Sequence, residues 1–165
     1  MKAGRFDLSR LAPPGYNWRR PLRFLNVCWG FGILYSWRVL IRWQEISQKL
    51  RGNDGKLLPD AVMEDFAVLF RPVGRYFLTV AAVFLLAELV LEWVYGRRGA
   101  RSDYTMRRLP QRFERVRRVA SLPALFCLAT LLLCFLLLLT WYAFYMLNTP
   151  PSRLAPGQWA KIWRL

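Results

Sequence analysis

The chain has 165 residues, of which 55% are hydrophobic and 16% aromatic, and its 25 Lys and Arg against 10 Asp and Glu give a formal charge of +15. Such an apolar fraction argues against a disordered basic tail, and such a charge argues against a uniformly hydrophobic plug. The chain lacks His and any Cys-x-x-Cys pair, which argues against a metal site, a disulfide framework and a His-dependent hydrolase. We therefore expect no cofactor and no bound metal.

The first apolar segment follows a basic N-terminal segment, residues 1–23, that contains six Lys and Arg. Only 14 uncharged residues separate the last of these arginines from Arg38, but a long Arg side chain near a helix end can extend to the membrane interface. We predict an uncleaved transmembrane helix over 24–43, with a shallow or re-entrant path as the alternative. Gly32 and Ser36 form a small-xxx-small pair that permits the close approach of another helix.

The segment 44–75 is predicted to be an extracytoplasmic loop that contains an amphipathic helix. Asp60 can cap this helix at its N-terminus, and Pro72 is expected to end it before the second span. Its apolar side chains recur at helical spacing: Val62, Phe66, Leu69 and Phe70. A surface helix packed on the membrane or on neighbouring spans is the interpretation we prefer.

The second span, 76–95, has the length of a membrane crossing but contains Glu88 and Glu92. These residues are four apart and share a helix face, at depths of about 12 and about 6 Å from the inner end. A carboxylate at such a depth must be paired, protonated or hydrated. We favour a structural contact for Glu92, whereas for Glu88 an inter-helix contact and a functional role both stay open. Arg38, the third intramembrane polar residue, is expected nearer the opposite interface and is a poor partner for Glu88.

The connection over 96–122 is predicted to be cytoplasmic, and it carries nine Arg before residue 119. From Pro110 onward, apolar residues and Arg alternate at helical spacing, which predicts a basic helix at the inner membrane face that ends at Pro123. The candidate contact residues are Arg107, Arg108, Arg112, Arg115, Arg117 and Arg118. Contact with anionic lipid and docking of a cytoplasmic partner are the two roles that we consider. Nucleic-acid binding is disfavoured because stacking aromatics are not interleaved with these arginines.

The third span, 123–147, is the strongest signal in the chain, because it lies within a long uncharged stretch and exceeds the roughly 20 residues that a crossing needs. Pro123 fits the first turn of this helix, where its missing N–H leaves no hydrogen bond unmade. The segment 148–165 is predicted to be an extracytoplasmic interfacial tail, with Trp159 and Trp163 on one face as an anchor. Tyr145 is expected in the aromatic belt at the same interface.

These elements predict an all-α integral membrane protein with three transmembrane helices and short amphipathic helices at the interfaces. Lys and Arg without compensating acids concentrate in 1–23 and in 96–118, whereas five acids accompany the seven basic residues of 38–75. Because basic loops stay in the cytoplasm, the N-terminus and the 96–122 segment are expected there, with the C-terminus on the opposite side.

Two segments carry a resemblance to known proteins: Tyr104–Arg118 (YTMRRLPQRFERVRR) and 148–163 (NTPPSRLAPGQWAKIW). The matching positions are Met106, Arg107, Arg108, Leu109, Pro110, Arg112, Thr149, Pro150, Pro156, Gly157, Gln158 and Trp159. On these residues the chain resembles little-characterised small Firmicutes membrane proteins associated with ABC-type (ABC-2-like) export systems. Family members often carry a longer basic run with His and Cys after the Arg-Arg-Leu-Pro stretch, where this chain has Phe113, Val116 and Val119.

The resemblance implies a non-catalytic subunit of an ABC-type transporter in a bacterial plasma membrane, assembled with other transporter subunits as a hetero-oligomer. The chain itself contains no GxxxxGK[ST] loop for a nucleotide. The alternative is a stand-alone membrane scaffold that interacts with anionic lipid. An integral-membrane enzyme is a third and weaker hypothesis, because only Glu88 and Glu92 could supply acid–base chemistry.

Overall fold

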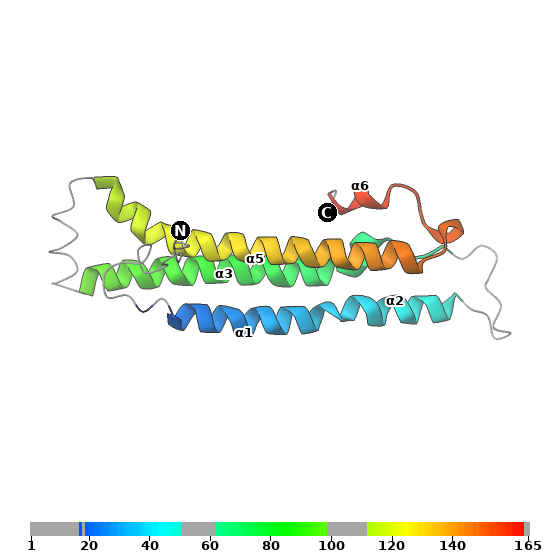
Figure 1. Ribbon diagram of the computed structural model, residues 1–165, viewed down its shortest axis with the longest axis horizontal. Helices are drawn as coiled ribbons and strands as arrows, with labels where there is room; N and C mark the ends of the chain where they lie inside the picture. Colours follow the sequence, from blue (N-terminus) through cyan, green and yellow to red (C-terminus); the bar gives the residue numbers. More distant parts are fainter. Residues whose placement is uncertain (1–16, 18, 51–61, 99–111, 164–165) are drawn as a thin grey trace, which may run out of the picture. The chain divides into compact units, whose positions relative to one another are not determined.

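The computed structural model describes residue 17 and residues 19–50, 62–98 and 112–163, most of which are helical (Figure 1). The elements are α1 (Arg19–Ser36), α2 (Arg38–Lys49), α3 (Phe66–Arg98), α5 (Arg112–Asn148), the 3-10 turn η2 (Pro151–Arg153) and α6 (Gln158–Ile162). No strand occurs among the described residues. The all-α prediction is confirmed.

Three helical segments of the described chain are long and apolar enough to cross a membrane. They are Arg19–Lys49, Phe66–Leu91 and Ala120–Asn148, with 31, 26 and 29 residues. Large apolar side chains point away from the protein along them, and Leu34 and Leu128, for example, are 68% and 65% exposed. Such exposure is typical of helices that face lipid or a partner. The prediction of three membrane-spanning candidates is confirmed, and it indicates a membrane protein.

The chain divides into two compact units, and each unit contains part of α1, α3 and α5. Unit 1 comprises Met1–Trp29 and Thr79–Leu131, and unit 2 comprises Gly30–Leu78 and Leu132–Leu165. Helices α2 and α6 and the η2 turn belong to unit 2 alone.

In unit 1, one apolar cluster joins all three long helices. Leu25 of α1, Phe84 of α3, and Leu122 and Phe126 of α5 are buried together. The rings of Phe84 and Phe126 meet edge to face, with 5.7 Å between their centroids. Because lipid is as apolar as these side chains, their packing stabilises the unit through van der Waals contact rather than through removal from water.

A polar contact lies beside this cluster. The indole N–H of Trp29 donates a hydrogen bond to Oγ1 of Thr130, at 3.1 Å. The Thr130 hydroxyl in turn donates to the carbonyl of Phe126 in its own helix, at 2.8 Å. Hydrogen bonds of this kind between membrane helices contribute roughly 0.6 kcal/mol on average, so this pair mainly fixes the rotation of α1 against α5 within the unit.

In unit 2, α1 and α3 approach closely at a glycine. Gly32 and Ser36, the predicted small-xxx-small pair, are both buried. A Cβ atom built on Gly32 would lie 2.5 Å from Cζ of Phe77 and 2.8 Å from Cε1 of Tyr76. Phe77 is itself fully buried, so its ring cannot move out of the way without displacing its neighbours. The close approach therefore requires glycine at this position.

A tight turn at Trp37 separates α1 from α2, which the prediction of one unbroken helix over 24–43 did not include. The Trp37 N–H bonds the carbonyl of Leu34, three residues back, and the helix resumes when the Ile41 N–H bonds the Trp37 carbonyl. Ser36 provides the physical reason, because its hydroxyl donates to the Ile33 carbonyl at 2.6 Å. A Ser side chain that bonds a preceding carbonyl competes with the backbone ladder and bends the helix.

The prediction that Pro72 ends a separate outer helix is wrong. Helix α3 runs from Phe66 to Arg98 without interruption and contains Pro72 in its second turn. The proline leaves only the Val68 carbonyl without its usual donor, and membrane helices tolerate such a loss. Phe66 is buried as expected of the apolar face, but Val62 lies outside the helix and is 62% exposed. The predicted cap, Asp60, lies outside the described residues.

The prediction that a basic helix ends at Pro123 and that a new helix starts there is also wrong. Helix α5 runs from Arg112 to Asn148 with Pro123 in its interior. Figure 1 shows that the first turns of α5 are inclined to the rest of the helix. A proline in a helix interior clashes with the carbonyl four residues before it and bends the helix there. Pro123 thus bends α5 without dividing it.

We expect the Gly32→Ala variant to be less stable than the wild type by about 1–3 kcal/mol, because the added Cβ overlaps the fixed Phe77 ring. Thermal unfolding of the purified protein in mild detergent measures this difference. The Gly30→Ala variant is the matched control, since no atom lies within 4 Å of a Cβ built there. Equal melting temperatures for the two variants would contradict a close approach at Gly32.

Candidate functional site

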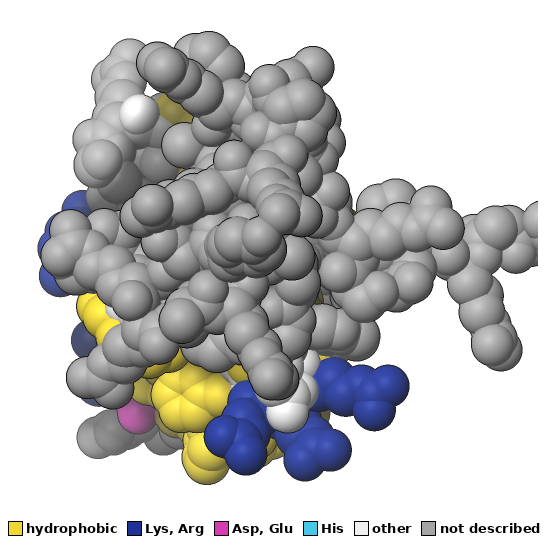
Figure 2. All heavy atoms as spheres, turned by 90° about the vertical axis from the view of Figure 1, so that its left-hand side faces the viewer, with side chains coloured by type: hydrophobic (Ala, Val, Ile, Leu, Met, Phe, Trp, Pro, Cys, Tyr) yellow, Lys and Arg dark blue, Asp and Glu magenta, His cyan; other side chains and the backbone are white. Residues whose placement is uncertain are grey.

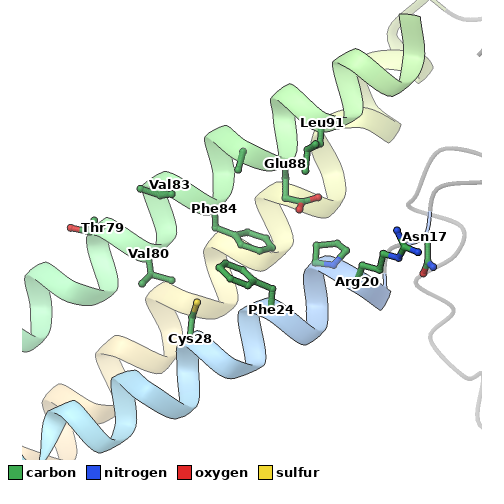
Figure 3. Close-up of a pocket in the computed structure, with 12 residues that line it drawn as sticks. Asn17, Arg20, Phe24, Cys28, Thr79, Val80, Val83, Phe84, Glu88 and Leu91 are labelled. Atoms are coloured by element: carbon green, nitrogen blue, oxygen red, sulfur yellow. The ribbon is translucent and has the colours of Figure 1, made fainter. Parts of the chain in front are cut away.

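A groove of about 800 Å³ lies between α1 and α3 in unit 1 (Figure 3). Its α1 wall extends from Arg20 to Cys28, and its α3 wall extends from Thr79 to Leu91. Eight of its twelve lining residues are apolar if Cys28 is counted among them. Figure 3 shows Arg20 beside Asn17 at the end of the groove where α3 carries Leu91. The groove is therefore apolar along its length and polar at one end.

Glu88 is part of the wall of this groove. Its side chain is only 4% exposed, so the structure buries this carboxylate within unit 1 instead of directing it to the surrounding lipid. Such burial fits the expectation that a carboxylate at this depth needs a local environment that satisfies it. The side chain of Glu92, one turn later, lies outside the described residues. Its prediction as a structural contact stays a prediction.

Arg38, the third predicted intramembrane polar residue, lies in unit 2 at the start of α2. Its guanidinium is 5.9 Å from the centroid of the Tyr35 ring, the geometry of a cation–π contact. The side chain is exposed, as snorkelling toward an interface requires.

The predicted basic contact segment is only partly described. Arg107 and Arg108 lie outside the described residues, and Arg112 begins α5. For Arg112, Arg115, Arg117 and Arg118 the structure describes the helical backbone but not the side chains. Exposed basic side chains also begin α1, at Arg19, Arg20 and Arg23. Figure 2 shows Lys and Arg side chains directly beside apolar ones.

In unit 2, the C-terminal tail is joined to the start of α3 by hydrogen bonds. The backbone N–H of Phe66, the first residue of α3, donates to Oε1 of Gln158 at 3.0 Å. Nε2 of the same amide donates to Oδ1 of Asp65 at 3.0 Å. The Tyr145 hydroxyl donates to the Glu64 carbonyl at 2.9 Å. Gln158 thus satisfies one of the N–H groups that a helix start leaves without a partner inside the helix.

Lys161 completes this cluster through an ion pair. Its ammonium donates to Oδ1 of Asp65 at 2.7 Å, and both side chains are about one-third exposed. The hydrogen bond from Lys161 lowers the pKa of the Asp65 carboxyl, with a further contribution from Gln158 and opposition from partial burial. Asp65 is therefore ionised at neutral pH and holds the tail through two donors.

The predicted interfacial aromatics have different environments. Tyr145 is only 1% exposed and packs against Phe66, so it belongs to the interior of unit 2 instead of an exposed aromatic belt. Trp159 is 40% exposed, and its ring meets that of Tyr142 at 5.2 Å. Trp163 is 63% exposed and meets Trp159 at 5.7 Å. The exposed Trp pair stays compatible with an anchor, although Trp159 also packs on α5.

Neither the groove nor the Gln158 cluster was predicted from the sequence. The two walls of the groove are about 60 residues apart, and Gln158 and Asp65 are 93 residues apart, so no local spacing marks either contact. Within the part of the chain that the structure describes, no group of three or more His, Cys, Asp or Glu side chains could hold a metal ion.

Comparisons with protein-family models, with curated proteins and with solved structures found no match to this chain. The function must therefore be argued from the residues and their arrangement.

We expect Gln158→Leu to destabilise the protein by about 1–3 kcal/mol, because it leaves the buried Phe66 N–H without an acceptor. Thermal unfolding followed by tryptophan fluorescence measures the loss. Gln48→Leu, on the exposed face of α2, is the matched control and should change stability by less than about 0.5 kcal/mol. Equal losses of stability in the two variants would show that the hydrogen bonds of the Gln158 amide do not stabilise the protein.

The Asp65–Lys161 pair predicts a pH dependence of stability. Because the folded pKa of Asp65 is lowered, its contribution is present above the unfolded pKa of about 3.9 and is lost as the pH falls through the folded pKa. At about pH 7 we expect Asp65→Asn to be less stable than the wild type by roughly 0.2–1 kcal/mol, as for a partly exposed pair. Melting curves at about pH 7 and below about pH 3 test this. A difference that is the same at both pH values would contradict the assignment.

Proposed function

We propose that this protein is a non-catalytic, multi-pass subunit of an ABC-type transporter in a bacterial plasma membrane. In this proposal the basic segment that ends in the first turns of α5 docks to a cytoplasmic partner. The transporter class rests on the family resemblance of Tyr104–Arg118 and of the tail, and the mode of action rests on the helices.

The observation that carries the proposal is the continuity of α5. The helix has 37 residues and a length of about 55 Å, whereas the hydrocarbon core of a bilayer is about 30 Å thick. Its candidate span begins at Ala120, so the turns from Arg112 to Val119 precede the span on the same helix. A partner that binds these turns therefore holds the membrane span directly, without an intervening loop.

The exposed apolar surface supports a role in a larger assembly. Phe24, Phe31 and Leu86 are each about 63% exposed; Phe24 of α1 and Leu86 of α3 lie in unit 1, and Phe31 of α1 lies in unit 2. The three candidate spans among the described residues are too few to enclose a translocation path readily, so a transport function needs further spans from partner subunits. The orientation in this proposal, with the N-terminus and the start of α5 in the cytoplasm, follows from the distribution of Lys and Arg.

Purification of the tagged protein from its native host in mild detergent, with mass spectrometry of the retained proteins, tests the proposal. We expect an ATPase that contains a GxxxxGK[ST] loop, together with a larger permease, in a stable ratio to the tagged chain. Recovery of the chain without either protein would overturn the transporter assignment.

Substitution of Arg112, Arg115 and Arg118 by Gln locates the docking surface. We expect this triple variant to insert in the membrane and to lose at least about tenfold of the bound partner, because charge-assisted contacts are removed. The matched control replaces Arg19, Arg20 and Arg23 by Gln, which removes the same charge from the other basic segment. Equal losses in both variants, or failed insertion of the first, would assign these arginines to membrane topology instead.

The second candidate function is a stand-alone membrane scaffold that interacts with anionic lipid. It is favoured by the exposed arginines at the start of α1, which lie next to the exposed apolar Phe24. The same purification distinguishes the two, because the scaffold would be recovered with lipid and without an ATPase.

A further inference from the structure

We propose that the groove between α1 and α3 in unit 1 is a binding site for one phospholipid with a net negative headgroup. An acyl chain would lie along the apolar walls, and the phosphate would lie at Arg20. This proposal is independent of which protein partner the chain has.

The apolar part of the groove matches a lipid chain in character and in length. Phe24 and Cys28 of α1 face Phe84 and Val80 of α3 across it (Figure 3). From Thr79 to Leu91 the α3 wall is about 18 Å long, close to the half-thickness of about 15 Å that one leaflet contributes to the hydrocarbon core. The volume of about 800 Å³ lies within the range of roughly 300–1,000 Å³ that small-molecule sites occupy.

The polar end of the groove provides the complement to a phosphate. Arg20 and Asn17 both line it at that end, and the guanidinium of Arg20 can donate two parallel hydrogen bonds to phosphate oxygens. Arg23, one turn along α1, is exposed but does not line the groove. A cation at one end of an apolar groove favours an amphiphile whose anionic headgroup stays at the interface.

Glu88 lines the same groove but does not make it a site for a cation. Glu88 is only 4% exposed, so its carboxylate is much less accessible to a ligand that enters from the open side than the guanidinium of Arg20 is. Arg20, in contrast, is exposed where the groove meets the end of α1. The accessible charge at this end of the groove is therefore that of Arg20, which favours an anionic headgroup over a cationic one.

Native mass spectrometry of the purified protein with defined lipids tests the proposal. The protein is exchanged into mild detergent that contains equal amounts of phosphatidylglycerol and phosphatidylcholine with identical acyl chains. We expect one retained lipid per chain, with phosphatidylglycerol preferred by at least about tenfold. Equal retention of both lipids, or retention of neither, would overturn the proposal.

Two pairs of variants distinguish lipid binding in this groove from general electrostatic attraction of anionic lipid to the protein. Arg20→Gln should reduce the preference for phosphatidylglycerol about tenfold, whereas Arg23→Gln, which removes the same charge outside the groove, should reduce it by less than about threefold. Ala87→Trp should block the groove, whereas Ala82→Trp is its control, an exposed alanine of α3 that does not line the groove. Equal effects within either pair would overturn the assignment to this groove.

A measurement on the unchanged protein guards against variants that fail to fold. A phosphatidylglycerol that carries a photoreactive group in its acyl chain is incubated with the wild-type protein in vesicles and then cross-linked. We expect the labelled positions to cluster between Phe24 and Cys28 of α1 and between Val80 and Leu91 of α3, and to be competed by unlabelled phosphatidylglycerol. Even labelling of all exposed apolar faces would show that the groove has no particular affinity.

Discussion

The side-chain amide of Gln158 makes two hydrogen bonds to the start of α3, one from the Phe66 N–H and one to the Asp65 carboxylate. A helix start leaves backbone donors without partners, and in unit 2 a residue from the far end of the chain satisfies one of them. With its first turn held in this way, α3 passes through Pro72 although the proline removes a backbone hydrogen bond from the following turn. The N-terminal turn of α3 is thus held by a contact between residues 92 positions apart.

Both long helices continue through a proline, but the two prolines lie in different surroundings. Pro72 follows the first turn of α3, which the tail of the chain contacts, whereas Pro123 lies near the middle of unit 1's part of α5, next to the buried Leu122. At Pro123 the packing of Leu122 and Phe126 in the cluster of unit 1 holds the helix after the bend. Both prolines look like helix boundaries in a sequence, since their local effect on hydrogen bonding is the same. In both helices, the neighbouring turns make contacts that support the helix on either side of the proline.

The sequence predicts those features that depend on local composition. Three apolar segments of sufficient length are visible because a membrane span requires about 20 apolar residues in succession. The burial of Gly32 and Ser36 also follows from their spacing, since small residues allow helices to approach. The groove at Arg20 and the Gln158 contact could not be predicted, because each joins side chains that are far apart in the chain. The turn at Trp37 depends on the direction of one hydroxyl, which spacing does not determine.

Phe84 lies between the groove of unit 1 and helix α5. It lines the groove together with Phe24. Its ring also contacts that of Phe126 in α5, with 5.7 Å between the ring centroids. Phe126 lies three residues after Pro123, where α5 resumes its direction after the bend. Packed side chains transmit displacement because interiors contain few voids. A ligand in the groove therefore contacts a side chain that supports the bent helix, and the turns of α5 that precede the bend belong to the segment proposed to dock a partner.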